Sequence, residues 1–76
     1  MRLVEIIREP VELFKILKFE GMVATGGEAK QVIARGQVRV NGEVETRKRK
    51  KIVAGDTVEF GRDRIRIQLT ETGSTR

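Results

Sequence analysis

Cysteine, histidine, tryptophan and tyrosine are all absent from this chain of 76 residues. The lack of cysteine and histidine removes disulfides, thiolate nucleophiles, the usual zinc ligands and the commonest general base. None of the serines and threonines stands beside a recognisable base in the sequence. We therefore expect no enzymatic activity, no metal, no cofactor and no small-molecule substrate.

Long apolar runs are also missing, because no run exceeds three residues. A helix that spans a membrane needs roughly 20 apolar residues, and a signal peptide needs a continuous apolar core. A cytoplasmic protein is therefore the expectation. The length suits one domain with a small core, which we assign to residues 1–70, followed by a disordered polar tail over residues 71–76.

Positive charge is what the chain has in excess, and the excess is local. Residues 30–51 hold eight Lys or Arg and two Glu, a balance of +6, whereas residues 1–29 sum to −1 and residues 52–76 sum to 0. Five of these cations are consecutive, from Arg47 to Lys51. Adjacent like charges repel one another, so we expect an anionic partner, and nucleic acid is the first candidate. A solvated loop is the plainer alternative.

A membrane surface and an acidic protein are the other anionic partners that the charge pattern allows. A membrane surface is the weaker candidate, because the cations lack the interleaved Trp, Phe or Leu of interfacial helices. An acidic protein is the main rival, with the chain acting as a protein-interaction or ribosome-assembly adaptor. Aromatic side chains are few, and we expect Phe14 and Phe60 to be used in the core. This favours recognition of nucleic-acid backbone and shape over base stacking.

The first part of the sequence predicts one strand and two helices. A strand is expected over residues 2–8, and a helix over residues 10–20, because Pro10 suits a first helical turn and an apolar stripe follows it. Gly21 is placed to end that helix. A second, short helix is predicted from the capping-box spacing of Thr25 and Glu28, and Gly36 is its natural end.

Two glycines stand where the second helix begins. Gly26 and Gly27 carry no side chains, so backbone N–H groups at this helix N-terminus are open to a phosphate oxygen. A flexible linker is the alternative interpretation. Glu28 would oppose a phosphate unless its side chain turns back into the cap.

The second part of the sequence predicts strands. Val38 and Val40 alternate with Arg39, and Asn41-Gly42 is the strongest short signal for a type I′ hairpin turn. Further strands are expected over about residues 57–60 and 64–69. The order βααβββ predicts an α+β domain in which two short helices pack on one face of a small, mostly antiparallel sheet.

Several of these segments together resemble the S4-like, or αL, RNA-binding domain. The resemblance covers about residues 11–60. It is carried by Leu13–Leu17 on the first helix, Gly21, Thr25–Ile33 on the second helix, Gly36–Gly42 and Val53–Val58. It implies binding of structured RNA, often ribosomal RNA, through the second helix and the adjoining loop and hairpin. We expect a monomer. On the positions that match, it implies contacts from Lys15, Thr25, Lys30, Gln31, Arg35 and Arg39.

The chain departs from that family's pattern at two places. Members usually begin the first helix with Arg-Leu-Asp, where this chain has Glu12-Leu13-Phe14, and they carry two arginines where it has Gly26 and Gly27. These replacements move the expected interface toward the backbone of the two glycines and toward the consecutive cations. The predicted RNA-binding set is therefore Lys15, Thr25, Gly26, Gly27, Lys30, Gln31, Arg35, Arg39, Arg47, Lys48, Arg49, Lys50 and Lys51.

Overall fold

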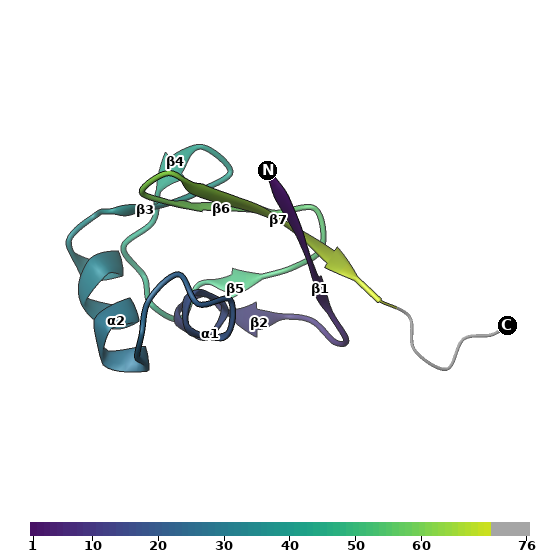
Figure 1. The fold of residues 1–76 in the computed structure, drawn as a ribbon, viewed down its shortest axis with the longest axis horizontal. Coiled ribbons are helices and arrows are strands. Elements are labelled where there is room, and N and C mark those ends of the chain that lie inside the picture. Colours follow the sequence, from purple (N-terminus) through teal and green to yellow (C-terminus); the bar gives the residue numbers. More distant parts are fainter. Residues whose placement is uncertain (71–76) are drawn as a thin grey trace, which may run out of the picture.

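Two helices lie against one face of a five-stranded sheet in this computed structural model, which describes residues 1–70 (Figure 1). The helices are α1 (Leu13–Phe19) and α2 (Gly26–Ala34). The sheet contains, in spatial order, β1 (Arg2–Ile6), β7 (Asp63–Leu69), β6 (Thr57–Phe60), β3 (Val38–Val40) and β4 (Glu43–Val44). Only β1 and β7 are parallel, and the other pairs are antiparallel. The predicted α+β class is confirmed.

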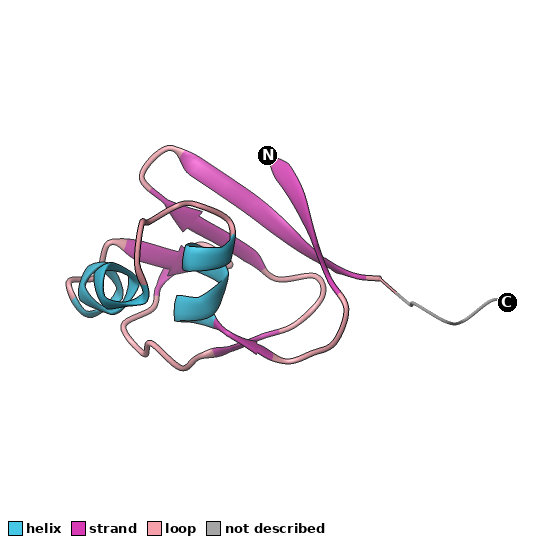
Figure 2. Ribbon diagram, turned by 60° about the horizontal axis from the view of Figure 1, so that its bottom comes forward, coloured by secondary structure: helices cyan, strands magenta, loops and turns pink. Residues whose placement is uncertain are grey.

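One apolar core lies between the helices and the sheet. Figure 2 shows the two helices, in cyan, beside each other on the same side of the magenta strands, and they pack on each other. Strand alternation directs every second side chain of the sheet toward them. No helix within residues 1–70 has the length and apolar character needed to cross a membrane. The largest fully buried side chains are Leu13, Leu17, Ile33, Val38, Ile52, Val58, Ile65 and Ile67.

The predicted ends of α2 are confirmed in detail. The Thr25 hydroxyl accepts a hydrogen bond from the Glu28 N–H at 3.0 Å, and the Glu28 carboxylate turns back to accept from Ala24 N–H at 2.9 Å. At the other end Gly36 has a φ of 76°, and the N–H groups of Gly36 and Gln37 donate back into the last turn. This is a Schellman-type end, for which glycine is favoured because left-handed backbone costs it little.

The Asn41-Gly42 turn is also confirmed, and it does more than connect β3 to β4. Both residues have positive φ, 55° and 86°, as a type I′ turn requires. The Asn41 amide donates to the Asp56 carboxylate at 3.0 Å and accepts from Thr57 N–H at 2.9 Å. The hairpin is therefore joined to the turn before β6. The strand alternation holds as well, since Val38 and Val40 are buried.

The predicted element order and the start of the first helix need correction. Residues 11 and 12 form a short strand, β2 (Val11–Glu12), which pairs with β5 (Lys51–Ile52) in a separate two-stranded ribbon. The helix therefore begins at Leu13 and not at Pro10, because the ribbon holds the preceding backbone extended. The strand predicted over residues 2–8 ends at Ile6. The βααβββ order omits β2, β4 and β5, and the tail predicted over residues 71–76 lies outside the described residues.

The core positions predicted for Phe14 and Phe60 are confirmed. Phe14 and Phe60 are half-buried and pack against the core, whereas Phe19 is exposed. Phe19 is the last residue of α1, and its ring lies outside the apolar stripe that faces the sheet.

Candidate nucleic-acid interface

The five consecutive cations, residues 47–51, form a segment that we call the basic loop. Its backbone is held by hydrogen bonds to the start of α1: Leu13 N–H donates to the Lys50 carbonyl at 2.9 Å and Phe14 N–H to the Lys48 carbonyl at 3.1 Å. The first N–H groups of a helix lack partners within the helix, and α1 has no side-chain cap. The loop supplies that cap with its own carbonyls. The sequence predicted an irregular loop, and the structure gives it a fixed position.

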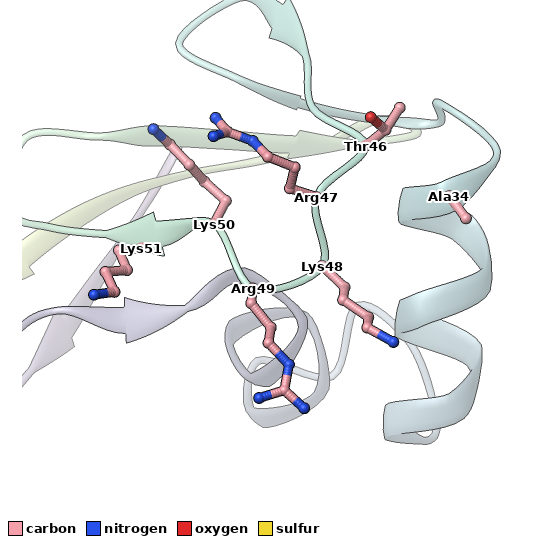
Figure 3. Close-up of a pocket in the computed structure, with 7 residues that line it drawn as sticks. All are labelled: Ala34, Thr46, Arg47, Lys48, Arg49, Lys50 and Lys51. Atoms are coloured by element: carbon pink, nitrogen blue, oxygen red, sulfur yellow. The ribbon is translucent and has the colours of Figure 1, made fainter.

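The basic loop borders an open hollow of about 810 Å³ beside α2. The loop, Thr46 and Ala34 of α2 line this hollow. Figure 3 shows Lys48 pointing toward α2 and Arg49 pointing past α1, whereas Arg47 and Lys50 project on the other side of the loop. The cations therefore do not form one flat patch, because their side chains point to both sides of the loop. Lys51, the last of them, belongs to β5 and not to the irregular segment.

Cations from α1, α2 and the basic loop contact Phe14 or the neighbouring Glu12. The Nζ atoms of Lys30 and Lys15 lie 4.9 Å and 5.9 Å from the centroid of the Phe14 ring, so each contacts the ring as a cation over an aromatic face. Lys15 also lies 3.6 Å from the Glu12 carboxylate, and the Arg49 guanidinium lies 3.9 Å from it. One carboxylate is therefore shared by two cations, and the surroundings remain net positive.

Arg47 differs from its neighbours because Glu45 engages it closely. The Glu45 carboxylate accepts from the Arg47 Nε at 2.9 Å, from its Nη2 at 3.2 Å and from its backbone N–H at 3.0 Å. The side-chain hydrogen bond from Arg47 lowers the pKa of Glu45, and the reciprocal bond raises the pKa of Arg47. Both groups are therefore charged together at neutral pH, and the charge of Arg47 is largely compensated within the chain.

The predicted residues on α2 stand on the helix that contributes Ala34 to the same hollow. Residues three and four apart share a helix face, so Lys30 and Gln31 lie one turn before Ala34, which lines the hollow. Within residues 1–70 nothing lies within 4 Å of the position that a side chain at Gly26 would take first, so the N-terminus of this helix is open. Arg35 is exposed at the C-terminal end of the helix. Thr25 caps α2.

Arg39 is the predicted site residue that the fold separates from the others. It alternates with Val38 and Val40, whose side chains are buried beneath the helices, so Arg39 lies on the opposite face of the sheet. There it is in register with Glu59 of β6. The expected single surface of helix, hairpin and loop is therefore divided, with Arg39 outside the group around the basic loop.

Glu45 and Glu12 are the site residues that the sequence analysis missed. Each lowers the charge available from a predicted contact, Glu45 at Arg47 and Glu12 at Arg49. The spacing Glu45-Thr46-Arg47 was a local signal for the first pair. The second pair had no local signal, because it depends on the β2–β5 ribbon that brings residue 12 to residue 51.

Two helices packed on a small sheet, with a cationic loop held at the start of the first helix, define a class of small binding domain. The S4 domain family model matches residues 4–68 of the chain, and the chain belongs to that family. The family inferred from the sequence is confirmed.

Particular relatives are found in two enteric bacteria. The chain is 54% identical over 57 residues to the YbcJ proteins of Escherichia coli (strain K12) and Shigella flexneri, which covers 75% of this chain and 81% of each relative. The solution structure of Escherichia coli YbcJ, described as revealing an αL motif involved in RNA binding, matches with a TM-score of 0.69 at 46% identity. That match covers 90% of this chain and 87% of the other.

Proposed function

We propose that this chain is a non-catalytic module that binds structured RNA, with ribosomal RNA as the first candidate, and that it acts as a cytoplasmic monomer. The observation that carries this proposal is the fixed basic loop, whose side chains extend from a backbone held on α1. The RNA-binding motif described for Escherichia coli YbcJ supports it.

The contacts would come from the basic loop, which lines the hollow with Thr46 and Ala34, and from the predicted residues of α1 and α2. Phosphate oxygens are best met by exposed cations and open backbone N–H groups, and such contacts position the nucleic acid without reading its sequence. Arg47 contributes less than its neighbours because Glu45 compensates it. The proposed surface therefore consists of Lys15, Thr25, Gly26, Gly27, Lys30, Gln31, Arg35, Lys48, Arg49, Lys50 and Lys51.

The electrostatic part of the proposal has a measurable scale. If Lys15, Lys30 and the loop cations other than Arg47 each neutralise one phosphate, affinity for an RNA stem should fall with salt with a log–log slope of roughly −5. A nearly flat salt dependence would show that phosphates are not the main ligand.

A triple charge reversal tests the location of the site. Lys48→Glu, Arg49→Glu and Lys50→Glu together should abolish binding of a labelled stem-loop RNA in fluorescence anisotropy. The melting temperature should stay close to that of the unmodified chain, because the loop is held by backbone atoms and no core residue changes.

The matched control makes the same total charge change elsewhere. Lys18, Arg62 and Arg66 are exposed, lie outside the basic loop and make no ion pair within residues 1–70. Their triple reversal to glutamate should weaken RNA binding far less. Equal losses in the two variants would show that only net charge matters, and binding that survives the loop reversal would place the site elsewhere. A pulldown from nuclease-treated lysate that depends on the loop cations would instead favour the adaptor alternative.

A further inference from the structure

A second hollow adjoins the hollow beside α2 at the side chain of Lys51. It has a volume of about 400 Å³ and is formed by the bend after β1, the β2–β5 ribbon and the first turn of α1. Lys51 lines both hollows, so the two adjoin on the surface of the chain. The residues that line the second hollow are Arg8, Pro10, Val11, Glu12, Lys15 and Lys51.

Cations surround the one carboxylate that lines this second hollow. A Glu12 carboxylate oxygen lies 3.6 Å from the Lys15 Nζ, and the other lies 3.9 Å from a guanidinium nitrogen of Arg49. Lys51 is in register with Glu12 across the ribbon, and the side chains of such partners stand on the same face. Arg8 is exposed and lines the same hollow. Three lining cations therefore face one carboxylate that Arg49 also engages, and the hollow keeps a net positive charge.

Arg8 is the cation of this hollow whose charge the fold leaves uncompensated. It forms no ion pair with any residue from 1 to 70. The neighbouring Glu9 is engaged elsewhere, because its carboxylate accepts a hydrogen bond from the Ala54 N–H at 2.8 Å. Glu5 and Glu20 lie with Arg8 along the adjacent groove between β1 and α1, but neither pairs with it. The guanidinium of Arg8 is therefore available to an anion from outside the chain.

The cations of the basic loop that point toward this hollow continue its positive surface. Figure 3 shows Arg49 and Lys51 pointing to the side of the loop on which α1 and β2 lie, whereas Lys50 points the other way. Pro10 and Val11 add apolar surface beside the cations. The effective dielectric constant near such a surface is lower than that of bulk water, so the attraction between a cation and an anion is stronger there.

We propose that this second hollow is a phosphate subsite of the RNA-binding surface and that Arg8 completes it. The inference rests on the proposed function: the RNA backbone that meets the basic loop continues past Lys51 and places a further phosphate between Arg8 and Lys15. A guanidinium suits this role because its planar fork can donate two hydrogen bonds to one phosphate. The ligand is thus a continuous run of phosphates that extends from the side of α2 to the bend between β1 and β2.

Arginine side-chain signals locate the subsite directly. The full chain, labelled with nitrogen-15, is titrated with a stem-loop RNA. We expect the Nε–H signal of Arg8 and the amide signals of Arg8 and Val11 to shift together with those of residues 48–50. The Nε–H signal of Arg62 should stay in place, because Arg62 lines neither hollow. A peptide of six glutamates should shift Arg8 less than the RNA does at the same concentration.

The salt dependence of RNA binding measures what Arg8 contributes. Arg8→Gln removes one phosphate contact, so the log–log slope on a duplex RNA should become shallower by about 0.9. Arg62→Gln is the matched control, because Arg62 is also an exposed arginine that forms no ion pair in the part of the chain that the structure describes. It should leave the slope unchanged. Neither side chain belongs to the core, so both variants should melt as the unmodified chain does.

The outcomes separate this subsite from the RNA-binding proposal on which it rests. RNA that shifts residues 48–50 but not Arg8, or equal slopes for Arg8→Gln and the unmodified chain, would overturn the subsite and leave the proposed function standing. An equal loss of slope in Arg62→Gln would show that only net charge is measured, and it would also overturn the subsite. A glutamate peptide that shifts Arg8 more than RNA does would assign the hollow to an acidic protein. The absence of any shift with RNA would refute the proposed function and the subsite with it.

Discussion

The pairing of Arg47 with Glu45 leads to a quantitative prediction about which cations meet the RNA. The Arg47 guanidinium donates two hydrogen bonds to the Glu45 carboxylate, and the Arg47 backbone N–H adds a third. A phosphate that approached Arg47 would have to displace a carboxylate that is already bound and is only 13% exposed. We therefore expect Arg47→Gln to leave the salt dependence of RNA binding nearly unchanged.

Removing the carboxylate should release the arginine. Glu45→Gln keeps the size of the side chain and removes its charge, so the loop gains one uncompensated cation. Each additional phosphate contact steepens the log–log salt slope by about 0.7 for single strands and about 0.9 for a duplex. In the Glu45→Gln background, Arg47→Gln should then reverse that gain.

The assay is fluorescence anisotropy of a labelled stem-loop RNA over a series of salt concentrations, applied to the two single variants and the double variant. Lys48→Gln serves as the comparison, because Lys48 has no ion-pair partner within residues 1–70 and should lose about 0.9 of slope on a duplex. Equal losses from Arg47→Gln and Lys48→Gln would refute the reasoning that Glu45 withholds Arg47 from the partner.

Further predictions concern stability, measured by urea unfolding. Gly36→Ala should lower the free energy of unfolding by about 1–2 kcal/mol, because the φ of 76° at Gly36 is left-handed. Gly27→Ala, at the start of the same helix, should be neutral or stabilising. Similar losses in the two variants would contradict this prediction. Leu17→Ala should cost about 2–5 kcal/mol because this side chain is fully buried, and a loss below about 1 kcal/mol would show that the core collapses around it. The pKa of Glu45 is lower in the folded chain than its ordinary value of 4.5, so the ionised carboxylate stabilises the fold at pH values above 4.5. That stabilisation is lost as the pH falls through the pKa of the folded state. The unmodified chain should therefore lose more stability than Glu45→Gln as pH falls below 4.5, and parallel curves would argue against the Arg47 pair.

Local signals in the sequence predicted the parts of the fold that are local. Thr25, Glu28 and Gly36 define both ends of α2, and the Asn41-Gly42 turn defines the hairpin, because each of these residues acts on backbone within a few positions. The parallel pairing of β1 with β7 joins the start of the chain to residues 65–69, and nothing local encodes it.

The error at the first helix has the same origin. Pro10 suits a helical first turn, but residues 11 and 12 are drawn into a ribbon with residues some 40 positions later. That ribbon also brings the loop carbonyls to the start of α1. The sequence thus indicated which cations matter as a group, while their individual availability depends on Glu45 and Glu12, whose positions come from the fold.

The basic loop is attached to α1 through main-chain atoms, because the two hydrogen-bond acceptors are the carbonyls of Lys48 and Lys50. Every amino acid carries that oxygen, so the side chains of the loop can change while its path stays the same. The loop is therefore suited to display: different sets of side chains at residues 47–50 could adapt the same framework to other polyanions. A library randomised at these four positions and screened for folded, RNA-selective members would exploit this separation of backbone from side chain.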